Sequence, residues 1–276
     1  MSDGATTGDL DLLLNDAKRK LRTSQQGAKA LEAMPLIYIL GESGSAKTTT
    51  VLRSGLDPEL LAGSAPREGE QVPTEVLNLW FTKVAALLEV GSHVRQNNRL
   101  LSRLVEHTRA RAYRSAFGTG AAPRAVVVCV DASQLLVADG GASLIASARA
   151  TGGQLREMSR LLGMPLPVYV IVTKLDRVAH FEEYVCNLSD DEVRQVFGAA
   201  LPANNASAGT YADEASRTLA LVLDRLCYQL GEFRVEFAFE RADFVHQHGD
   251  LRRHLTLPRC ATMADDCGWA MPTPAG

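Results

Sequence analysis

The chain has 276 residues, of which 46% are hydrophobic and 22% are charged, and its formal net charge is −3. This composition predicts a packed core in one large domain, or in a domain with a smaller extension. The slight excess of acidic residues argues against a nucleic-acid partner, since proteins that bind nucleic acid carry basic surfaces. The five scattered cysteines form no CxxC pair, which favours a reducing, cytoplasmic compartment.

The start of the chain does not look like a targeting segment. Its first residues, MSDGATTGDLDLLLNDAKRK, lack the basic start and the apolar stretch of a signal peptide. No apolar run approaches the roughly 18 residues that are needed to cross a bilayer. We therefore expect a soluble chain as given, which could be a piece of something larger.

Apolar periodicity and turn residues divide the chain into elements. In chain order they predict a helical lead-in over 9–33, a strand over 36–40, a helix over 47–54, a loop over 63–73, strands over 75–81 and 84–89, an amphipathic helix over 97–116, a buried strand over 124–131, a helix over 141–162, a buried strand over 167–172, and helices over 189–198 and 211–236. The arginines of the amphipathic helix are expected on a solvated face.

Buried strands that alternate with helices predict an α/β fold with a mostly parallel sheet flanked by helices. The pattern divides the chain into a helical lead-in (1–34), the α/β domain (35–200) and a helical extension with a tail (201–276). Ligands bind such sheets outside the carboxyl ends of the strands. Because polar residues follow several of the predicted strands, we expect a nucleotide site at that edge.

The stretch GESGSAKTTT, residues 41–50, follows the first predicted strand and matches the phosphate-binding pattern G-x-x-x-x-G-K-[ST] except at one position. In such a loop the backbone N–H groups surround the phosphates, the lysine reaches the β- and γ-phosphates, and the hydroxyl of the last residue ligates Mg²⁺. The expected contacts are Gly41, Glu42, Ser43, Gly44, Ser45, Ala46, Lys47, Thr48 and Thr49. Ala46 stands where the pattern has glycine, so we expect a weakened loop. A strand–helix turn without a ligand is the alternative.

The stretch TKLD, residues 173–176, follows the last predicted strand and resembles the guanine-reading motif [NT]-K-x-D. Asp176 would accept hydrogen bonds from the ring N–H and the exocyclic amine of guanine, a pair of donors that adenine lacks in that arrangement. The aliphatic stem of Lys174 would lie over the base. Thr173, Lys174 and Asp176 are therefore expected base contacts for GTP or GDP, and ATP is the alternative ligand.

Residues near the predicted strand over 84–89 suit a magnesium ion. Glu89 ends that strand, and its carboxylate would hold the ion's shell. Thr74 could cap the ion with its hydroxyl, although a threonine there also simply starts a strand. The expected metal ligands are thus Thr48, Thr74 and Glu89. His93 is the nearest candidate for a catalytic group, with an ordinary surface histidine as the alternative, and fast hydrolysis is not expected.

Several stretches together resemble the cytoplasmic domain of the IcmF/TssM family, whose members are inner-membrane components of bacterial type VI secretion machines. The stretches PLIYILGESGSAKTTTVLRSGL, PTEVLNLWF, PRAVVVCVDASQLL, LPVYVIVTKLD and LTLPR match family blocks in order and spacing, over roughly residues 35–260. The stretch ALLEVGS departs from the family's VLIDTAGR at Glu89 and Ser92.

The resemblance implies a P-loop, GTPase-like fold with a C-terminal helical extension, acting as a guanine-nucleotide switch or scaffold with weak or no hydrolysis. It implies partners among the other membrane-complex and baseplate proteins. It also implies a place at the cytoplasmic face of the bacterial inner membrane, if the chain belongs to a longer anchored protein. A pseudo-GTPase module that binds no nucleotide and an ATPase of the same fold are the alternatives, and slow GTP hydrolysis is left open.

Overall fold

The computed structural model describes residues 6–23, 31–64, 74–109, 122–136, 140–179, 181–186, 188, 198, 200, 217–222, 224–225 and 228. Two compact units divide the chain. The first comprises Met1–Asp131 with Gln154–Thr173, and the second comprises Ala132–Gly153 with Lys174–Gly276. All the described strands belong to the first unit.

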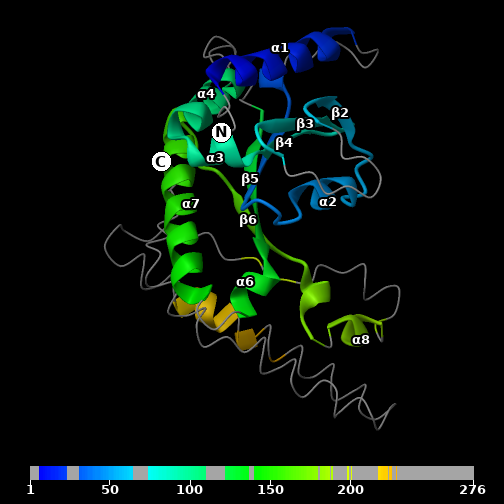
Figure 1. Ribbon diagram of the computed structural model, residues 1–276, viewed down its shortest axis with the longest axis vertical. Coiled ribbons are helices and arrows are strands. Elements are labelled where there is room, and N and C mark those ends of the chain that lie inside the picture. The colour runs from blue at the N-terminus through cyan, green and yellow to red at the C-terminus, as the bar shows by residue number, and fades with distance from the viewer. Residues whose placement is uncertain are drawn as a thin grey trace, which may run out of the picture. The chain divides into compact units, whose positions relative to one another are not determined.

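The first unit is built on a six-stranded sheet with the order β2-β3-β4-β1-β5-β6 (Figure 1). Its strands are β1 (Leu36–Gly41), β2 (Glu59–Ala62), β3 (Leu77–Phe81), β4 (Ala86–Val90), β5 (Arg124–Asp131) and β6 (Val168–Thr173). Strands β4, β1, β5 and β6 are parallel, whereas β3 runs antiparallel to both of its neighbours. The prediction of an α/β fold with a mostly parallel sheet is therefore confirmed.

Helices flank this sheet. In the first unit these are α1 (Thr7–Thr23), the 3₁₀ turn η1 (Leu31–Ala33), α2 (Lys47–Leu52), α3 (Ser92–Gln96) and α4 (Asn98–Thr108). Helix α7 (Gly140–Leu162) begins in the second unit and ends in the first, and the second unit also holds α6 (Ala132–Leu136), η2 (Leu175–Arg177) and α8 (Phe181–Val185). No helix in the described part of the chain is long and apolar enough to cross a membrane.

Alternation along the strands gives the sheet two apolar faces. On one face Ile39 packs in a cluster with Val51 of α2, Trp80 of β3 and Leu87 of β4. On the other face the hydroxyl of Tyr38 lies 2.6 Å from Thr108 Oγ1 of α4. Helix α1 packs beside α4 and against β2 and β3. Because both faces are covered, the central strands read as continuous apolar runs.

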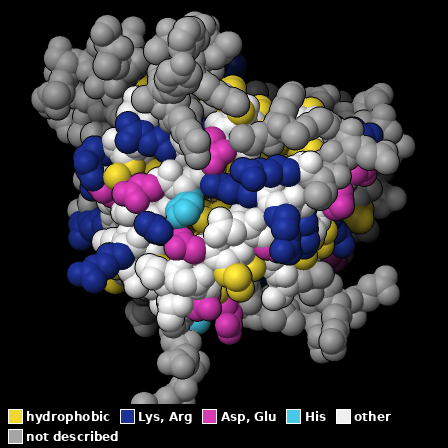
Figure 2. Space-filling model, turned by 90° about the horizontal axis from the view of Figure 1, so that it is seen from above, with side chains coloured by type: hydrophobic (Ala, Val, Ile, Leu, Met, Phe, Trp, Pro, Cys, Tyr) yellow, Lys and Arg dark blue, Asp and Glu magenta, His cyan; other side chains and the backbone are white. Residues whose placement is uncertain are grey.

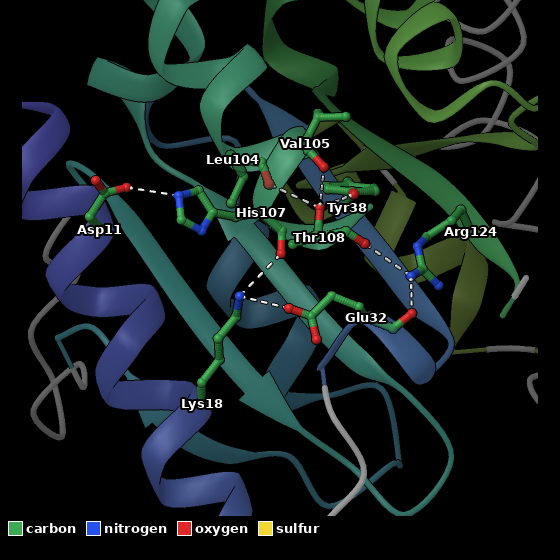
Figure 3. A network of polar contacts seen from close by, with 9 residues as sticks. All are labelled: Asp11, Lys18, Glu32, Tyr38, Leu104, Val105, His107, Thr108 and Arg124. Atoms are coloured by element: carbon green, nitrogen blue, oxygen red, sulfur yellow. Dashed lines mark hydrogen bonds and ion pairs between the residues drawn. The ribbon is translucent and has the colours of Figure 1, made fainter. Parts of the chain in front are cut away.

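A polar network secures α1, η1 and α4 at the end of the sheet where β1 and β5 begin (Figure 3). The guanidinium of Arg124 donates to the carbonyl oxygens of Met34 and Glu32, both at 2.8 Å, and of Thr108 at 3.0 Å. Lys18 of α1 pairs with the Glu32 carboxylate at 2.8 Å. The Arg124 guanidinium thereby ties η1 to α4 through their carbonyls, and Lys18 adds α1 to the same network.

The charged surface on the side of α1 carries both signs. Figure 2 views the molecule from above and shows basic and acidic side chains interspersed on this face. Arg103 pairs with Asp11 at 3.0 Å, and Lys20 pairs with Asp16 at 3.2 Å. Since these side chains are substantially exposed, water and salt screen them, and they add little to the stability of the fold.

Most predicted elements agree with the structure, and the deviations have local causes. The strands expected over 36–40, 124–131 and 167–172 and the helix over 141–162 are present as β1, β5, β6 and α7. The prediction that the strand over 167–172 is buried is wrong, because β6 lies at the edge of the sheet, and Tyr169 and Val170 are 59% and 53% exposed. Of the predicted lead-in, α1 forms Thr7–Thr23 and the 3₁₀ turn η1 forms Leu31–Ala33, and residues 24–30 lie outside the described residues. Strand β2 was not predicted.

One predicted boundary near β4 is wrong, and one helix there was not predicted. Glu89 lies inside β4 rather than at its end, because its backbone pairs with both β1 and β3. The helix predicted over 97–116 is preceded by the separate helix α3, since the side chain of Asn97 accepts hydrogen bonds from the N–H groups of Arg99 and Leu100 and so starts α4 anew.

Some predicted features are not tested. The helix over 189–198 lies almost wholly outside the described residues, as do residues 110–116, 65–73 and most of 211–236. The division into 1–34, 35–200 and 201–276 stays a prediction.

Candidate functional site

The loop after β1 turns sharply before α2 begins at Lys47. The N–H of Ser45 donates to the carbonyl of Glu42 at 3.2 Å, which closes the turn. Gly41 has a φ of +155°, and a Cβ there would lie 2.4 Å from Ser45 Oγ and 2.7 Å from the Cys129 carbonyl. Only glycine fits this position, because either contact would push the loop away from β5.

Lys47 folds back across this loop. Its ammonium donates to the carbonyls of Gly41 at 3.1 Å and Glu42 at 2.9 Å, and the residue is 6% exposed. Burial lowers the pKa of Lys47, and the nearby Glu89 carboxylate opposes this shift. A phosphate bound in the loop would favour the charged form and would replace the two carbonyls as the partner of the ammonium.

Ala46 adopts the left-handed conformation, with φ 56° and ψ 29°. A side chain is unfavourable in this region, which accounts for the glycine of the phosphate-binding pattern. The loop nevertheless forms: the carbonyl of Ala46 accepts the first hydrogen bond of α2, from the N–H of Thr50 at 2.9 Å. The departure at Ala46 therefore leaves the strand–loop–helix path intact.

Ser45 and Thr173 connect the loop to the end of β6. The hydroxyl of Thr173 donates to the carbonyls of Ser45 and Val130, both at 3.1 Å. Ser45 is 2% exposed, and its own hydroxyl has no hydrogen-bond partner among the described residues. An unpartnered buried hydroxyl beside the loop is a donor that a bound anion would satisfy.

The other predicted nucleotide contacts are placed as follows. Ser43, Gly44 and Thr49 are exposed at the loop and the first turn of α2. Lys174 and Asp176 belong to the second unit, where Lys174 adopts a left-handed conformation (φ 58°) and Asp176 lies in η2. Their reading of a base stays a prediction.

The three predicted metal ligands come together on one carboxylate. Glu89 is 1% exposed, and its Oε1 accepts hydrogen bonds from Thr48 Oγ1 at 2.5 Å and Thr74 Oγ1 at 2.7 Å. Its Oε2 accepts from Asn78 Nδ2 and Trp80 Nε1, both at 3.2 Å. Neutral donors on both oxygens satisfy the buried charge, which would otherwise be costly.

These residues suit a hard cation. Each hydroxyl donates a hydrogen bond to Glu89 and keeps its oxygen lone pairs, and oxygen ligands are those that Mg²⁺ prefers. Among the described residues no group of three or more His, Cys, Asp or Glu side chains could hold a metal ion. A cation at this place would therefore depend on the hydroxyls of Thr48 and Thr74.

Asn78, Trp80 and Arg95 were not predicted as members of the site. Asn78 lies directly across from Glu89 in the β3–β4 pairing, and Trp80 lies on the same face of β3. Arg95 of α3 forms an ion pair with Glu42 of the loop at 2.6 Å. The stretch NLWF carried the signal for the first two, a polar residue and an indole two positions apart, but only the strand register shows what they face.

His93 remains a candidate without a tested role. The backbone N–H of His93 donates to the carbonyl of Glu75 at 2.9 Å. The ring Nδ1 is buried without a hydrogen-bond partner among the described residues. His93 lies in α3, three residues after the end of β4.

Comparisons with known proteins bear on the family. Residues 124–257 match the model of the IcmF-related N-terminal domain. The chain is 29% identical over 201 residues to the type VI secretion system component TssM1 of Pseudomonas aeruginosa. The matched region covers 67% of this chain and 17% of that protein. The chain thus spans about a sixth of the length of this relative. No solved structure matches the chain. The family resemblance inferred from the sequence is confirmed.

Proposed function

Because the chain carries an IcmF-related N-terminal domain over residues 124–257 and is distantly homologous to TssM1, we propose that it is a guanine-nucleotide-binding domain of a type VI secretion membrane-complex protein. In this proposal it acts as a P-loop switch or scaffold with weak or no hydrolysis. The matched range begins at β5 and leaves out the loop after β1. The nucleotide part of the proposal therefore depends on the geometry of that loop.

The observation that carries the proposal is the position of Lys47. The strand, the loop and the helix follow one another as in a phosphate-binding site, and the lysine ammonium already lies over the loop's carbonyls. The order of strands reverses at β1, which has β4 on one side and β5 on the other. Open α/β sheets bind ligands at such a reversal, outside the carboxyl ends of the strands.

The side chains of this region have separable roles in binding. Lys47 would neutralise the phosphates, and the hydroxyl of Ser45 and the loop N–H groups would donate to phosphate oxygens. Thr48 and Thr74 would offer lone pairs to Mg²⁺ while their hydroxyls donate hydrogen bonds to Glu89. The ion, when bound, would screen the charge of the phosphates.

The base preference rests on Asp176, which would accept from guanine donors, and an ATPase of the same fold is the alternative. The proposal includes no fast hydrolysis, because no glutamine follows Glu89 to position a water and Ser92 replaces a glycine. His93 is the remaining candidate for slow turnover.

The cellular part of the proposal comes from the relative. TssM1 is by its name a component of the type VI secretion system. We infer that this domain acts at the cytoplasmic face of the bacterial inner membrane, with other membrane-complex and baseplate proteins as partners. A module that binds no nucleotide and only holds such partners is the second candidate.

Isothermal titration calorimetry on the purified chain with GTP, ATP and Mg²⁺ tests the proposal. Binding of GTP that is lost in Lys47→Ala supports it, since a charge-assisted phosphate contact contributes about 1.5–3 kcal/mol. Lys83→Ala, which removes an exposed lysine in the turn between β3 and β4, is the matched control. Absence of binding at millimolar nucleotide selects the scaffold, and a preference for ATP removes the role of Asp176.

A further inference from the structure

Two threonines from distant segments meet on a single carboxylate oxygen. Thr48 is the second residue of α2, and Thr74 lies before β3. Both hydroxyls nevertheless donate hydrogen bonds to Glu89 Oε1, at 2.5 and 2.7 Å. Every group in this contact belongs to the protein itself. Glu89 thus joins the segment that carries Thr74 to helix α2.

The backbone supports the same docking. The carbonyls of Thr74, Glu75 and Val76 accept hydrogen bonds from the N–H groups of Ser92, His93 and Gly91, at 3.1, 2.9 and 2.9 Å. A Cβ on Gly91 would lie 2.4 Å from the carbonyl carbon and oxygen of Glu75. Glycine at this position is therefore required for the two segments to approach so closely.

Asn78 joins the two parts of this arrangement. Its Nδ2 donates to Thr74 Oγ1 at 3.0 Å and to Glu89 Oε2 at 3.2 Å. Its Oδ1 accepts from the N–H of Ser64 at 3.0 Å. Asn78 is 3% exposed, so these bonds have no competition from bulk water. One amide thus fixes both the threonine and the carboxylate to which that threonine donates.

The length of the Glu89 side chain decides whether its carboxylate reaches the two threonines. Its Cα is paired with those of Asn78 and Ile39 in the sheet, so the start of its side chain is fixed by the backbone. An aspartate would end one carbon–carbon bond, about 1.5 Å, short of the present carboxylate. Hydrogen bonds of 2.5 and 2.7 Å to the two threonines would not survive such a retreat.

We propose that Asn78 and Trp80 are positioning residues of the nucleotide site, which hold Glu89 so that Thr48 and Thr74 are brought together before any nucleotide binds. The inference rests on the proposed function, because there the two threonines are the magnesium ligands. Its consequence is that Thr74 is docked in the free and in the loaded domain. Nucleotide then adds stability without moving the segment 74–76.

Hydrogen–deuterium exchange of the free protein tests the docking without nucleotide. The reporters are the amides of Gly91, Ser92 and His93, whose acceptors are the carbonyls of residues 74–76. In the wild type these amides are expected to be protected, and Asn78→Leu should raise their exchange about tenfold or more, as expected when a hydrogen bond to a charged group is lost. Equal protection in both proteins would overturn the role of Asn78.

The dependence of nucleotide affinity on magnesium separates positioning from general support of the fold. The measured quantity is the ratio of the Kd for GTP in EDTA to the Kd in Mg²⁺. Asn78→Leu and Thr74→Val are expected to reduce this ratio about tenfold. Trp80→Phe, which keeps an aromatic ring but loses the indole N–H, should reduce the ratio less. Thr82→Val removes a buried hydroxyl bond to the Ala85 carbonyl in the same hairpin and is the matched control.

The outcomes distinguish the two levels of the proposal. A wild-type protein that binds no nucleotide overturns the proposed function, while exchange in Asn78→Leu still decides whether the docking exists. If Asn78→Leu lowers the melting temperature as Thr82→Val does and leaves the magnesium ratio unchanged, Asn78 supports the fold only, and the inference is wrong. If GTP with Mg²⁺ strongly protects the amides of residues 91–93 in the wild type, Thr74 is not docked in advance.

Discussion

Replacing Ala46 by glycine tests why the phosphate loop departs from its pattern. The alanine holds φ 56° and ψ 29°, a conformation in which a left-handed L-residue is strained by about 1–2 kcal/mol. Glycine has no such strain, but it loses more freedom on folding, which costs about 0.5–1 kcal/mol. The difference leaves a net gain of about 0.5–1 kcal/mol in the free energy of unfolding. We therefore expect Ala46→Gly to raise the melting temperature by roughly 1–4 °C.

The same substitution has a second, independent effect on binding. The loop is already formed with Ala46 in the left-handed region, so its strain is present in the free and the bound protein and cancels in the affinity. What remains is the contact of the methyl group with a phosphate or with the N–H groups that face it. A misplaced N–H···phosphate bond costs about 1–2 kcal/mol, which corresponds to a Kd for GTP that is roughly 5- to 30-fold lower in Ala46→Gly.

Scanning calorimetry and nucleotide titration separate the two effects. Asp57→Gly is the matched control, because Asp57 is an exposed non-glycine residue with a positive φ of 48° outside the loop. It should change stability without changing the Kd. The reasoning is refuted if Ala46→Gly leaves both the melting temperature and the Kd at the wild-type values, since the left-handed alanine would then be neither strained nor in the way.

Three further outcomes are expected. Asp176→Asn should weaken GTP binding far more than ATP binding in parallel titrations, because an acceptor oxygen becomes an amide donor that faces guanine donors, and equal losses would count against base reading. Arg124→Met should lower the free energy of unfolding by about 3 kcal/mol in urea denaturation, since it leaves the buried carbonyls of Met34 and Thr108 without their donor, and a change below about 1 kcal/mol would show that these carbonyls find other partners. Because burial lowers the pKa of Lys47, the unfolded chain binds more protons than the folded one between the lowered and the ordinary lysine pKa. Stability should therefore rise with pH across that window, and Lys47→Met should abolish that part of the rise.

The sequence predicts best where the pattern is strong and the backbone path is short. The strands β1 and β5 are continuous, largely buried apolar runs, and β6 is an equally apolar run at the exposed edge of the sheet, so the positions of all three follow from composition. The strand–loop–helix path over residues 36–52 follows from spacing, because the pattern of Gly41 and Lys47 requires a strand to end and a helix to begin there. These features are local, so a single sequence contains them.

Other parts of the fold depend on pairing, which the sequence does not display. Strand β2 has four residues, Glu-Leu-Leu-Ala, with no alternation, and it exists because β3 offers an edge to pair with. Glu89 reads as a strand end, but pairing on both sides draws it into β4. The roles of Asn78 and Trp80 depend on the register that places Asn78 across from Glu89. A slip of one residue would turn both side chains to the other face.

The arrangement at Lys47 and Glu89 suggests why nucleotide binding should be weak for reasons beyond Ala46. Within the protein itself, Lys47 has two carbonyl partners, and Glu89 has donors on both of its oxygens. A phosphate gains only the difference between its own contact with Lys47 and the bonds that it replaces. Pre-docking of Thr74 works in the opposite direction, because the entropy of ordering that segment is spent before binding. In the proposed site, the affinity for nucleotide would therefore reflect competition at Lys47 against preorganisation at Thr74. The two effects can be measured apart, because Lys47 would act with or without magnesium, whereas Thr74 would act only through the ion.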